Sequence, residues 1–556
     1  MFHKDFEGPN GAELLVQCLE SAGVTHIFGI PGAKIDPLFE ALVDSSIELI
    51  VCRHEQNAGF MAAAMGRITG RPGVCIGTSG PGTSNFCTAM ITATTEGDPV
   101  VCLTGAVPRR MRHQKTHQSM DNVAIMRPVT KYAQEAESTD AIPELIAAAF
   151  KEACAPRKGA SYLSLPYDVM LNEAHGHVLP TEPPPVGAAP SDLITQAAAI
   201  IAGASNPVLI VGMAASEHAA AGAIRSLLRA RPIPIVGTWE AAGVVPRDCV
   251  DSFFGRVGLF RNQPGDLLLE NADVIVTLGF NPVEYDPSTW NASGHATLVH
   301  IDEVTADPDE HYCPKLELIG DLAATITALH QVLPELPAIN DRPSIEKVRV
   351  ALANAKVLPK THSNIPIHPL EAIRQLQLVT DDHGTVICDV GSLYIWMGRH
   401  FMCYEPRHLL FSNGQQTLGV ALPWAISACL ARPNTTVLSM SGDGGFLFSA
   451  QELETAVRLG CNFTHIVWRD GRYDMVAFQQ RMKYGRDSGV DFGEPDIVAY
   501  AEAFGATGLR LEQADQLSEL VQQGMNTPGP VLIDMPVDYS DNDSLAATMQ
   551  DIARWH

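Results

Sequence analysis

The sequence predicts an α/β protein made of three doubly wound parallel-sheet domains. Two observations predict this class. Short apolar runs, such as residues 74–77, 99–104 and 208–211, alternate with helical patterns along most of the chain, which is typical of parallel strands joined by crossover helices. The chain also has 556 residues, more than one hydrophobic core holds, since single domains run to roughly 100 to 200 residues.

Two proline-rich breaks predict where the domains meet. One covers residues 179–185, and the other covers residues 333–343 with Pro359 and Pro366 beyond it. Proline-rich stretches of this kind are typical of connections between domains. We therefore expect domains at residues 9–175, 190–340 and 365–545. The first and third are α/β segments of similar length, and the sequence leaves open whether one duplicates the other.

Composition excludes several classes of function. The chain has 38 basic and 63 acidic residues, a formal charge of -25, which repels a phosphate backbone and argues against nucleic-acid binding. An anionic substrate would need a local cation.

The 12 cysteines are scattered without a C-x-x-C pair. Residues 1–11 lack the apolar run of a secretory signal, and no stretch is apolar enough to span a bilayer. We expect a cytoplasmic protein without a membrane partner.

A glycine-rich turn in the third segment predicts a phosphate and metal anchor. The apolar run 436–440 is followed by Ser441-Gly442-Asp443-Gly444-Gly445-Phe446 and then by a helical pattern at 450–459. Such a turn lets backbone N–H groups approach a phosphate, which the positive end of the helix also attracts. Asp443 stands where a hard cation bridging the phosphate would need an oxygen ligand.

A second acid supports this interpretation. The next apolar run, 463–468, ends just before Asp470. Because neighbouring parallel strands end at the same edge of a sheet, Asp443 and Asp470 can converge on one ion. An isolated Gly-Asp-Gly is more often a turn whose acid only caps it, but the second acid at a strand end favours the cation site.

The α/β pattern alone also suggests a nicotinamide-dependent dehydrogenase. No Gly-x-Gly-x-x-Gly turn opens a first βαβ unit with an acid about twenty residues later, as the dinucleotide fingerprint requires. We set this class aside.

The anchor resembles the Gly-Asp-Gly motif of thiamine-diphosphate-dependent enzymes, which closes about 30 residues later in a metal-binding Asn or Asp. The resemblance implies thiamine diphosphate held through Mg²⁺ by Asp443, Asp470 and the backbone carbonyl of Arg472. The commoner Asn-Asn closing pair is replaced here by Asp470-Gly471. An Asp still supplies the oxygen ligand.

The first segment carries the context of the family's activating glutamate. Residues 47–52 form an apolar run that ends at Arg53-His54-Glu55-Gln56-Asn57. A glutamate after a strand is usually a helix cap or first-turn acid. By the resemblance, Glu55 would hydrogen-bond the aminopyrimidine of the cofactor and promote removal of the thiazolium proton.

Several further stretches narrow the resemblance to catabolic acetolactate synthases. It extends along nearly the whole chain and is densest at residues 29–36, 116–121, 254–260, 413–419 and 473–493. The resemblance implies that two pyruvates condense to 2-acetolactate and carbon dioxide through an enamine formed on the cofactor. It also implies three domains that are pyrimidine-binding, central and diphosphate-binding in order.

The resemblance assigns site residues one by one. The expected catalytic residues are Glu55, Gln118, Lys34 and Gln479. Leu418 would prop the cofactor in a bent shape, with a plain core leucine as the alternative. For Gln479 the alternative is a surface glutamine without a role in catalysis. For Lys34 the alternative is a solvated surface charge. The expected cofactor contacts are Gly29, Pro31, Glu55, Thr78, Gly80, Asn85, Gly391, Ser392, Gln416, Leu418, Gly442, Asp443, Gly444, Gly445, Tyr473, Asp474 and Met475.

FAD is predicted to be absent. Biosynthetic acetohydroxyacid synthases carry a Gly-Met-His-Gly pattern and an Arg-rich segment where this chain has residues 258–263 and 281–285. A FAD-containing acetohydroxyacid synthase or pyruvate oxidase is the alternative, and an inactive regulatory or scaffold paralogue is an alternative of another class. The family also implies a homodimer or homotetramer with shared active sites. The sequence leaves open which of these forms, and whether pyruvate or 2-ketobutyrate is the preferred acceptor.

Overall fold

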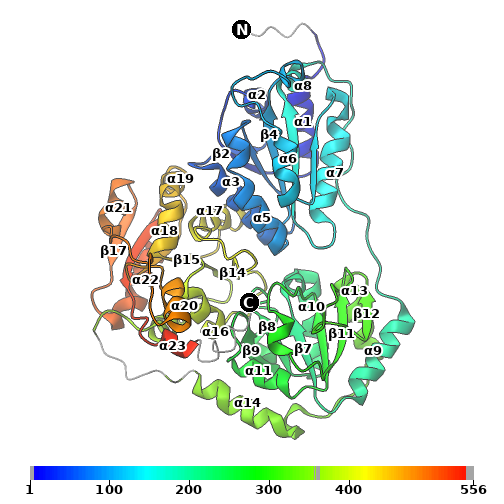
Figure 1. Ribbon diagram of the computed structural model, residues 1–556, viewed down its shortest axis with the longest axis vertical. Coiled ribbons are helices and arrows are strands. Elements are labelled where there is room, and N and C mark those ends of the chain that lie inside the picture. Colours follow the sequence, from blue (N-terminus) through cyan, green and yellow to red (C-terminus); the bar gives the residue numbers. More distant parts are fainter. Residues whose placement is uncertain (1–5, 356, 358–363, 546–556) are drawn as a thin grey trace. The chain divides into compact units, whose positions relative to one another are not determined.

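A computed structural model describes residues 6–355, 357 and 364–545 of the chain (Figure 1). The chain divides into two compact units. Unit 1 comprises Met1–Pro184, Leu422–Pro433 and Ser449–Cys461, so two segments from the last third of the sequence belong to it. Unit 2 comprises Pro185–Ala421, Asn434–Phe448 and Asn462–His556. Of the predicted connection residues, Pro359 lies outside the described ranges.

Three six-stranded parallel sheets form the framework of the described residues, which confirms the predicted fold class. The first sheet has the strand order β2-β1-β3-β4-β6-β5. Its strands are β1 (His26–Gly29), β2 (Glu48–Val51), β3 (Gly73–Gly77), β4 (Val100–Ala106), β5 (Tyr132–Glu135) and β6 (Ala160–Pro166). Its helices are α1 (Gly11–Ser21), α2 (Asp36–Leu42), α3 (Glu55–Thr69), α4 (Pro81–Ser84), α5 (Cys87–Glu96), α6 (Asn122–Met126), α7 (Ile142–Cys154) and α8 (Tyr167–Leu171).

The second sheet has the order β12-β11-β10-β7-β8-β9. Its strands are β7 (Pro207–Val211), β8 (Ile235–Thr238), β9 (Phe253–Val257), β10 (Val274–Leu278), β11 (Thr297–Asp302) and β12 (Leu316–Ile319). The helices of this part are α9 (Ser191–Gly203), α10 (His218–Ala230), α11 (Pro264–Glu270), α12 (Pro287–Trp290), α13 (Leu322–Val332) and α14 (Pro343–Asn354).

Both faces of the second sheet are covered, as a doubly wound fold requires. Along β7, Leu209 and Val211 pack into one apolar cluster with α9, α10 and α13, while Val208 and Ile210 pack into another with α11, α12 and α14. Side chains of a strand point alternately to opposite faces. The continuous apolar run at 207–211 therefore reflects burial on both sides.

The third sheet has the order β14-β13-β15-β16-β18-β17. Its strands are β13 (Thr385–Cys388), β14 (Leu409–Phe411), β15 (Val437–Gly442), β16 (Thr464–Arg469), β17 (Thr507–Arg510) and β18 (Val531–Pro536). The helices in this part of the sequence are α15 (Pro369–Val379), α16 (Ser392–His400), α17 (Ala421–Ala431), α18 (Asp443–Ser449), α19 (Leu453–Arg458), α20 (Asp474–Tyr484), α21 (Ile497–Ala503), α22 (Leu517–Asn526) and α23 (Asn542–Leu545). Of these, α19 and all of α17 beyond Ala421 belong to unit 1.

The first and third sheets share one topology. Numbered from the first strand of each, both orders read 2-1-3-4-6-5, which supports the duplication that the sequence left open. In both, the chain reverses its direction of travel across the sheet between the first and third strands. Ligands of open α/β sheets bind at this switch point, beyond the carboxyl ends of the strands.

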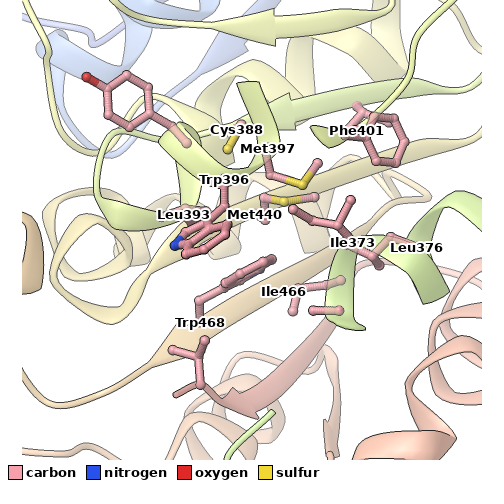
Figure 2. Packing of buried hydrophobic residues seen from close by; sticks show 14 of the residues in the cluster. Ile373, Leu376, Cys388, Leu393, Trp396, Met397, Phe401, Met440, Ile466 and Trp468 are labelled. Atoms are coloured by element: carbon pink, nitrogen blue, oxygen red, sulfur yellow. The ribbon is translucent and has the colours of Figure 1, made fainter. Parts of the chain in front are cut away.

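A large apolar core supports the third sheet (Figure 2). Cys388 from β13, Met440 from β15, and Ile466 and Trp468 from β16 pack with side chains of α15 and α16, and all four are buried. Figure 2 shows these strand residues facing Leu393, Trp396 and Met397 of α16. The core thereby fixes the strand ends from which the anchor emerges.

One expectation about local structure is wrong. The helix after the anchor begins at Asp443 rather than at residue 450, because the glycine turn is itself the first turn of a helix. A short 3₁₀ turn at Ala450–Glu452 then precedes α19.

No helix in the described ranges has both the length and the apolar composition needed to cross a membrane.

Candidate active site

The anchor turn brings its two predicted acids together. Gly442 at the end of β15 pairs with Trp468 of β16, so Asp443 and Asp470 follow at the same sheet edge. Asp443 is 1% exposed. Its Oδ2 accepts the N–H of Asp470 at 3.1 Å and that of Gly471 at 2.7 Å, and its Oδ1 accepts the N–H of Gly444 at 2.9 Å. The Asp443 carboxylate therefore fixes the turn that carries Asp470.

Three carboxyl groups crowd this edge. Burial, then the charges of Asp443 and Asp474, raise the pKa of Asp470 to about 8. Burial also raises the pKa values of Asp443 and Asp474. A carboxyl whose pKa is raised by burial and by two neighbouring acids lies in a site suited to a cation, since a cation would stabilise its ionised form.

The acids alone do not enclose a metal ion. Within the described ranges, no group of three or more His, Cys, Asp or Glu side chains has the arrangement of a metal site. A cation at Asp443 and Asp470 would need further oxygens from a backbone carbonyl and from its own ligand. That requirement suits Mg²⁺, which commonly binds one or two carboxylates together with phosphate oxygens.

Two glycines of the turn are needed for space. A Cβ on Gly444 would lie 2.6 Å from the Tyr473 ring, and one on Gly445 would lie 3.3 Å from Asp389. A Cβ on Gly442 would approach no atom more closely than 3.8 Å. Gly444 and Gly445 therefore allow close packing, whereas a Cβ at Gly442 would make only ordinary van der Waals contact.

The turn from Asp470 to Tyr473 is held by the segment that follows α20. The N–H of Tyr473 donates to the Val490 carbonyl at 2.8 Å, and the N–H of Phe492 donates to the Gly471 carbonyl at 3.1 Å. The Arg472 guanidinium forms an ion pair with Asp491 at 2.6 Å. Residues 490–492 are therefore bonded to the anchor turn.

Asp474 joins the anchor to the residues after β13. The Ser392 hydroxyl donates to Asp474 Oδ2 at 2.6 Å, and Asn542 Nδ2 donates to the same oxygen. Gly391, at φ +148°, precedes Ser392 at the start of α16. The predicted contacts Gly391, Ser392 and Asp474 thus lie around one switch point, between β13 and β15.

Asp389 is a site residue that the sequence analysis missed. It is 1% exposed, and it accepts the N–H groups of Val390, Gly419 and Ala421 at 2.8 to 3.2 Å. Burial raises its pKa to about 7. Asp389 therefore fixes the loop that carries Gln416 and Leu418. Asp470 was predicted because it directly follows a strand, and Asp389 directly follows β13 in the same way.

The loop held by Asp389 lies beside a large cavity. Gln416 has a left-handed backbone with φ 49°, a strained conformation that tends to occur at functional sites. Leu418 and Met475 are partly buried against the core of the third sheet. Gln416, Met475 and Gln479 line a cavity of about 1420 Å³ in unit 2, together with residues of the central part such as Phe260 and Glu284. Gln479 is therefore not simply a surface side chain.

Unit 1 holds the predicted glutamate. Glu55 is the first residue of α3, and the His54 imidazole caps the helix by accepting the Gln56 N–H at 3.1 Å. Asn85 Nδ2 donates to Glu55 Oε2 at 2.9 Å. A Cβ on Gly82 would lie 3.5 Å from Glu55 Oε1. Glu55 is thus a first-turn acid of a helix, as is usual for a glutamate after a strand. Its carboxylate also faces the glycine loop after β3.

Glu452, which the sequence analysis also missed, fixes the residues on both sides of Glu55. Glu452 is fully buried. Its Oε1 accepts the Arg53 N–H at 2.9 Å, and its Oε2 accepts Asn57 Nδ2 at 2.7 Å. The contact spans almost 400 residues of sequence, so no local pattern could have found it.

The remaining predicted residues of unit 1 meet at the loop after β3. The Ser79 hydroxyl donates to the Gln118 carbonyl at 2.5 Å, and Gln118 has φ 59° with an exposed side chain. The Thr78 hydroxyl accepts the Lys34 N–H at 3.3 Å. A Cβ on Gly80 would lie 3.1 Å from Gln118.

Two predicted contacts lie just beyond β1. Gly29 ends the strand, and a Cβ there would lie 2.4 Å from the Ile76 carbonyl. Pro31 is exposed two residues later. Glu55 and the residues around it thus belong to unit 1, while the Asp443 anchor belongs to unit 2.

Comparison with known proteins identifies the family. Three family models of the thiamine pyrophosphate enzymes match: the N-terminal TPP binding domain at residues 9–125, the central domain at 194–329 and the C-terminal TPP binding domain at 389–535. The chain belongs to the thiamine pyrophosphate enzyme family. Thiamine pyrophosphate is the same compound as thiamine diphosphate.

Curated relatives place the chain among the acetolactate synthases of this family. It is 53% identical over 540 residues to an acetolactate synthase of Bacillus subtilis, covering 97% of this chain and 95% of the relative. It is 46% identical over 540 residues to a catabolic acetolactate synthase of Raoultella terrigena, covering 96% of each. A probable acetolactate synthase large subunit of Methanococcus aeolicus is 30% identical over 559 residues, 96% of this chain and 92% of the relative.

Proposed function

We propose that this chain condenses two pyruvates to 2-acetolactate and carbon dioxide, with thiamine diphosphate bound through Mg²⁺. The observation that carries the proposal is the meeting of Asp443 and Asp470 at the ends of β15 and β16, in a chain similar over its length to acetolactate synthases. When bound, the cofactor supplies a carbon nucleophile and an electron sink for decarboxylation.

The residues of the anchor fit the proposed magnesium diphosphate. The Asp443 and Asp470 carboxylates and the Arg472 carbonyl would hold Mg²⁺, whose charge would offset the crowding that raises the pKa of Asp470. Helix α18 begins at Asp443, directly after the end of β15 at Gly442. Helix starts of this kind favour phosphate.

Glu55 would hold the proton that activates the cofactor. Its Oε2 already accepts the Asn85 amide, which orients the carboxylate and leaves Oε1 facing the glycine loop. A carboxyl at Oε1 could donate to a ring nitrogen of the cofactor and take the proton back later. In the proposed assembly, Glu55 comes from one chain and the anchor from its partner, in a homodimer or homotetramer.

Three polar side chains would orient the substrate. Gln118 and Gln479 can donate amide hydrogens to a carboxylate or a developing oxyanion without changing charge. Lys34 is the cation expected to attract pyruvate, and in the described ranges its ammonium group has no ion pair. It lies in the loop whose backbone is bonded to Thr78.

We assign the enzyme to the cytoplasm.

FAD absence is part of the proposal, and the charge of the cavity supports it. The segments that depart from the flavin-binding pattern, at 258–263 and 281–285, contribute to the wall of the large cavity. Its lining includes Arg261 and five acids: Asp266, Glu270, Glu284, Asp286 and Asp309. Carboxylates in this excess would repel the diphosphate of a flavin dinucleotide.

Carbon dioxide release from pyruvate tests the proposal. The purified protein should release carbon dioxide only when both Mg²⁺ and thiamine diphosphate are supplied, and it should be colourless. Release without either addition, after dialysis against a chelator, would contradict the anchor. Flavin absorbance in the purified protein would favour a FAD-containing acetohydroxyacid synthase or pyruvate oxidase.

A further inference from the structure

Tyr539 lies at the same sheet edge as the anchor acids. It follows β18, which runs parallel to β16 with Arg469 opposite Pro536. The N–H of Val537 donates to the Arg469 carbonyl at 3.1 Å, and the N–H of Asn542 donates to the Tyr539 carbonyl at 3.0 Å. Asn542 in turn is bonded to Asp474. Both the strand before Tyr539 and the turn after it are therefore tied to the acid cluster.

Among the residues that the structure describes, none is a hydrogen-bond partner of the Tyr539 hydroxyl. Its oxygen is buried, and no group in the described ranges lies within hydrogen-bonding reach. The ring packs against the core that contains Trp468, which limits its movement. A buried hydroxyl without a partner is costly, so native structures rarely leave one without water, an ion or a ligand.

The surroundings of the hydroxyl indicate what is missing. Burial and the negative charges of Asp470, Asp474 and Asp443 raise the pKa of Tyr539 well above its ordinary value, so the group is a protonated donor. The three carboxylates act on the pKa of Tyr539, but none of them is a hydrogen-bond partner of its hydroxyl. A partner for this hydroxyl must carry an acceptor oxygen, and near three carboxylates it must be compatible with a cation.

We propose that the Tyr539 hydroxyl donates a hydrogen bond to an oxygen of the bound magnesium diphosphate group, either a phosphate oxygen or a water on the ion. This rests on the proposed function, because it requires the cation site at Asp443 and Asp470. Tyr539 then helps to bind the cofactor and takes no part in the acid–base chemistry assigned to Glu55.

Tyr394 provides a matched control within unit 2. Its hydroxyl is also buried and without a partner in the described ranges. Its ring, however, packs edge-on against Trp239 at 5.0 Å, inside the apolar core, and burial, Glu240 and Cys388 raise its pKa, with no contribution from the anchor acids. Replacing each tyrosine by phenylalanine removes the same atom in two different settings.

The experiment compares Tyr539→Phe and Tyr394→Phe with the unaltered full-length protein, each freed of cofactor. Calorimetric titration with thiamine diphosphate at fixed excess Mg²⁺ gives Kd, and magnesium pyrophosphate serves as a second probe of the diphosphate site. Thermal unfolding without ligand reports the structural cost. We expect Tyr539→Phe to weaken both ligands about tenfold, which is 1.4 kcal/mol, with an unliganded Tm equal to or above that of the unaltered protein.

Other outcomes would overturn the proposal. An unchanged Kd in Tyr539→Phe, or the same weakening in Tyr394→Phe, would remove the specific role. A lower unliganded Tm with no extra loss on binding would make Tyr539 a structural residue. If the unaltered protein binds neither ligand, the cation site fails, and the proposed function fails with it before the tyrosines are compared.

Discussion

Asn85 Nδ2 donates a 2.9 Å hydrogen bond to Glu55 Oε2. This bond joins the loop after β3 to the first residue of α3 and leaves the other carboxylate oxygen beside Gly82. The carboxylate is thus oriented by the chain itself before any ligand binds. Orientation of this kind is what a proton-transferring group needs.

Glu55→Gln should lower the rate of carbon dioxide release from pyruvate by at least about a hundredfold, the usual contribution of a positioned acid–base group. The amide keeps the size of the side chain, so the thermal unfolding temperature should stay within a degree or two. Glu40→Gln, on the exposed face of α2, is the matched control. Nearly normal activity in Glu55→Gln would show that another group activates the cofactor.

Asp443→Asn should weaken the binding of Mg²⁺ and raise the apparent Kd for the ion about a hundredfold, because a charged ligand is lost. The amide can still accept backbone N–H groups on one side, so the protein should fold. Initial rates over a range of Mg²⁺ concentrations measure the effect. Asp515→Asn changes an exposed acid after β17 and should leave the curve unchanged, whereas equal shifts in both variants would argue against the anchor.

Asp389→Ala should destabilise the protein by about 3 kcal/mol, because the buried N–H groups of Val390, Gly419 and Ala421 lose their acceptor. Activity should fall further than the folded fraction explains, since Gln416 and Leu418 lie on the released loop. Asp389→Asn keeps one acceptor oxygen, so its stability should lie between those of Asp389→Ala and the unaltered protein. Urea unfolding and rates measured well below Tm separate the effects, and full activity in the folded alanine variant would dismiss the loop argument.

The buried His465 should make the free energy of unfolding depend on pH. Its ring nitrogens are 2.8 Å from the Ser439 and Ser441 hydroxyls, and burial lowers its pKa to about 3. In the unfolded chain the pKa is near the ordinary 6.5, so between about pH 6.5 and 3 the unfolded state binds the extra proton. The stabilisation is complete above pH 6.5 and is lost as pH falls.

His465→Gln should therefore flatten the fall in unfolding free energy between pH 6.5 and 4.5. Urea midpoints across this range measure it, compared with His383→Gln, whose exposed ring should leave the slope as it is. Parallel slopes in His465→Gln and the unaltered protein would mean that other groups carry the acid sensitivity.

The sequence predicted those features that depend on neighbours along the chain. Buried strands such as β7 appear as continuous apolar runs because both faces are covered. The convergence of Asp443 and Asp470 could be predicted because both follow adjacent parallel strands. The start of α18 was placed too late, since Gly442 to Gly445 suggested a loop, whereas packing against Tyr473 and Asp389 allows a helix there.

Features that depend on distant residues were not predicted. Glu452 reaches Arg53 and Asn57 across almost the whole chain, and Tyr539 shares the anchor edge because β18 lies beside β16. Neither follows from spacing or composition. Asp389 was within reach, because it follows a strand as Asp470 does, but its partners Gly419 and Ala421 lie 30 or more residues away.

The product formed from pyruvate tests the central claim most directly. Pyruvate labelled with carbon-13 at its keto carbon is incubated with the purified protein, Mg²⁺ and thiamine diphosphate, and the products are followed by NMR. The account predicts 2-acetolactate that carries label at two adjacent carbons, with one carbon dioxide released for each molecule formed. Acetaldehyde or acetate as the main product, or no turnover, would contradict it.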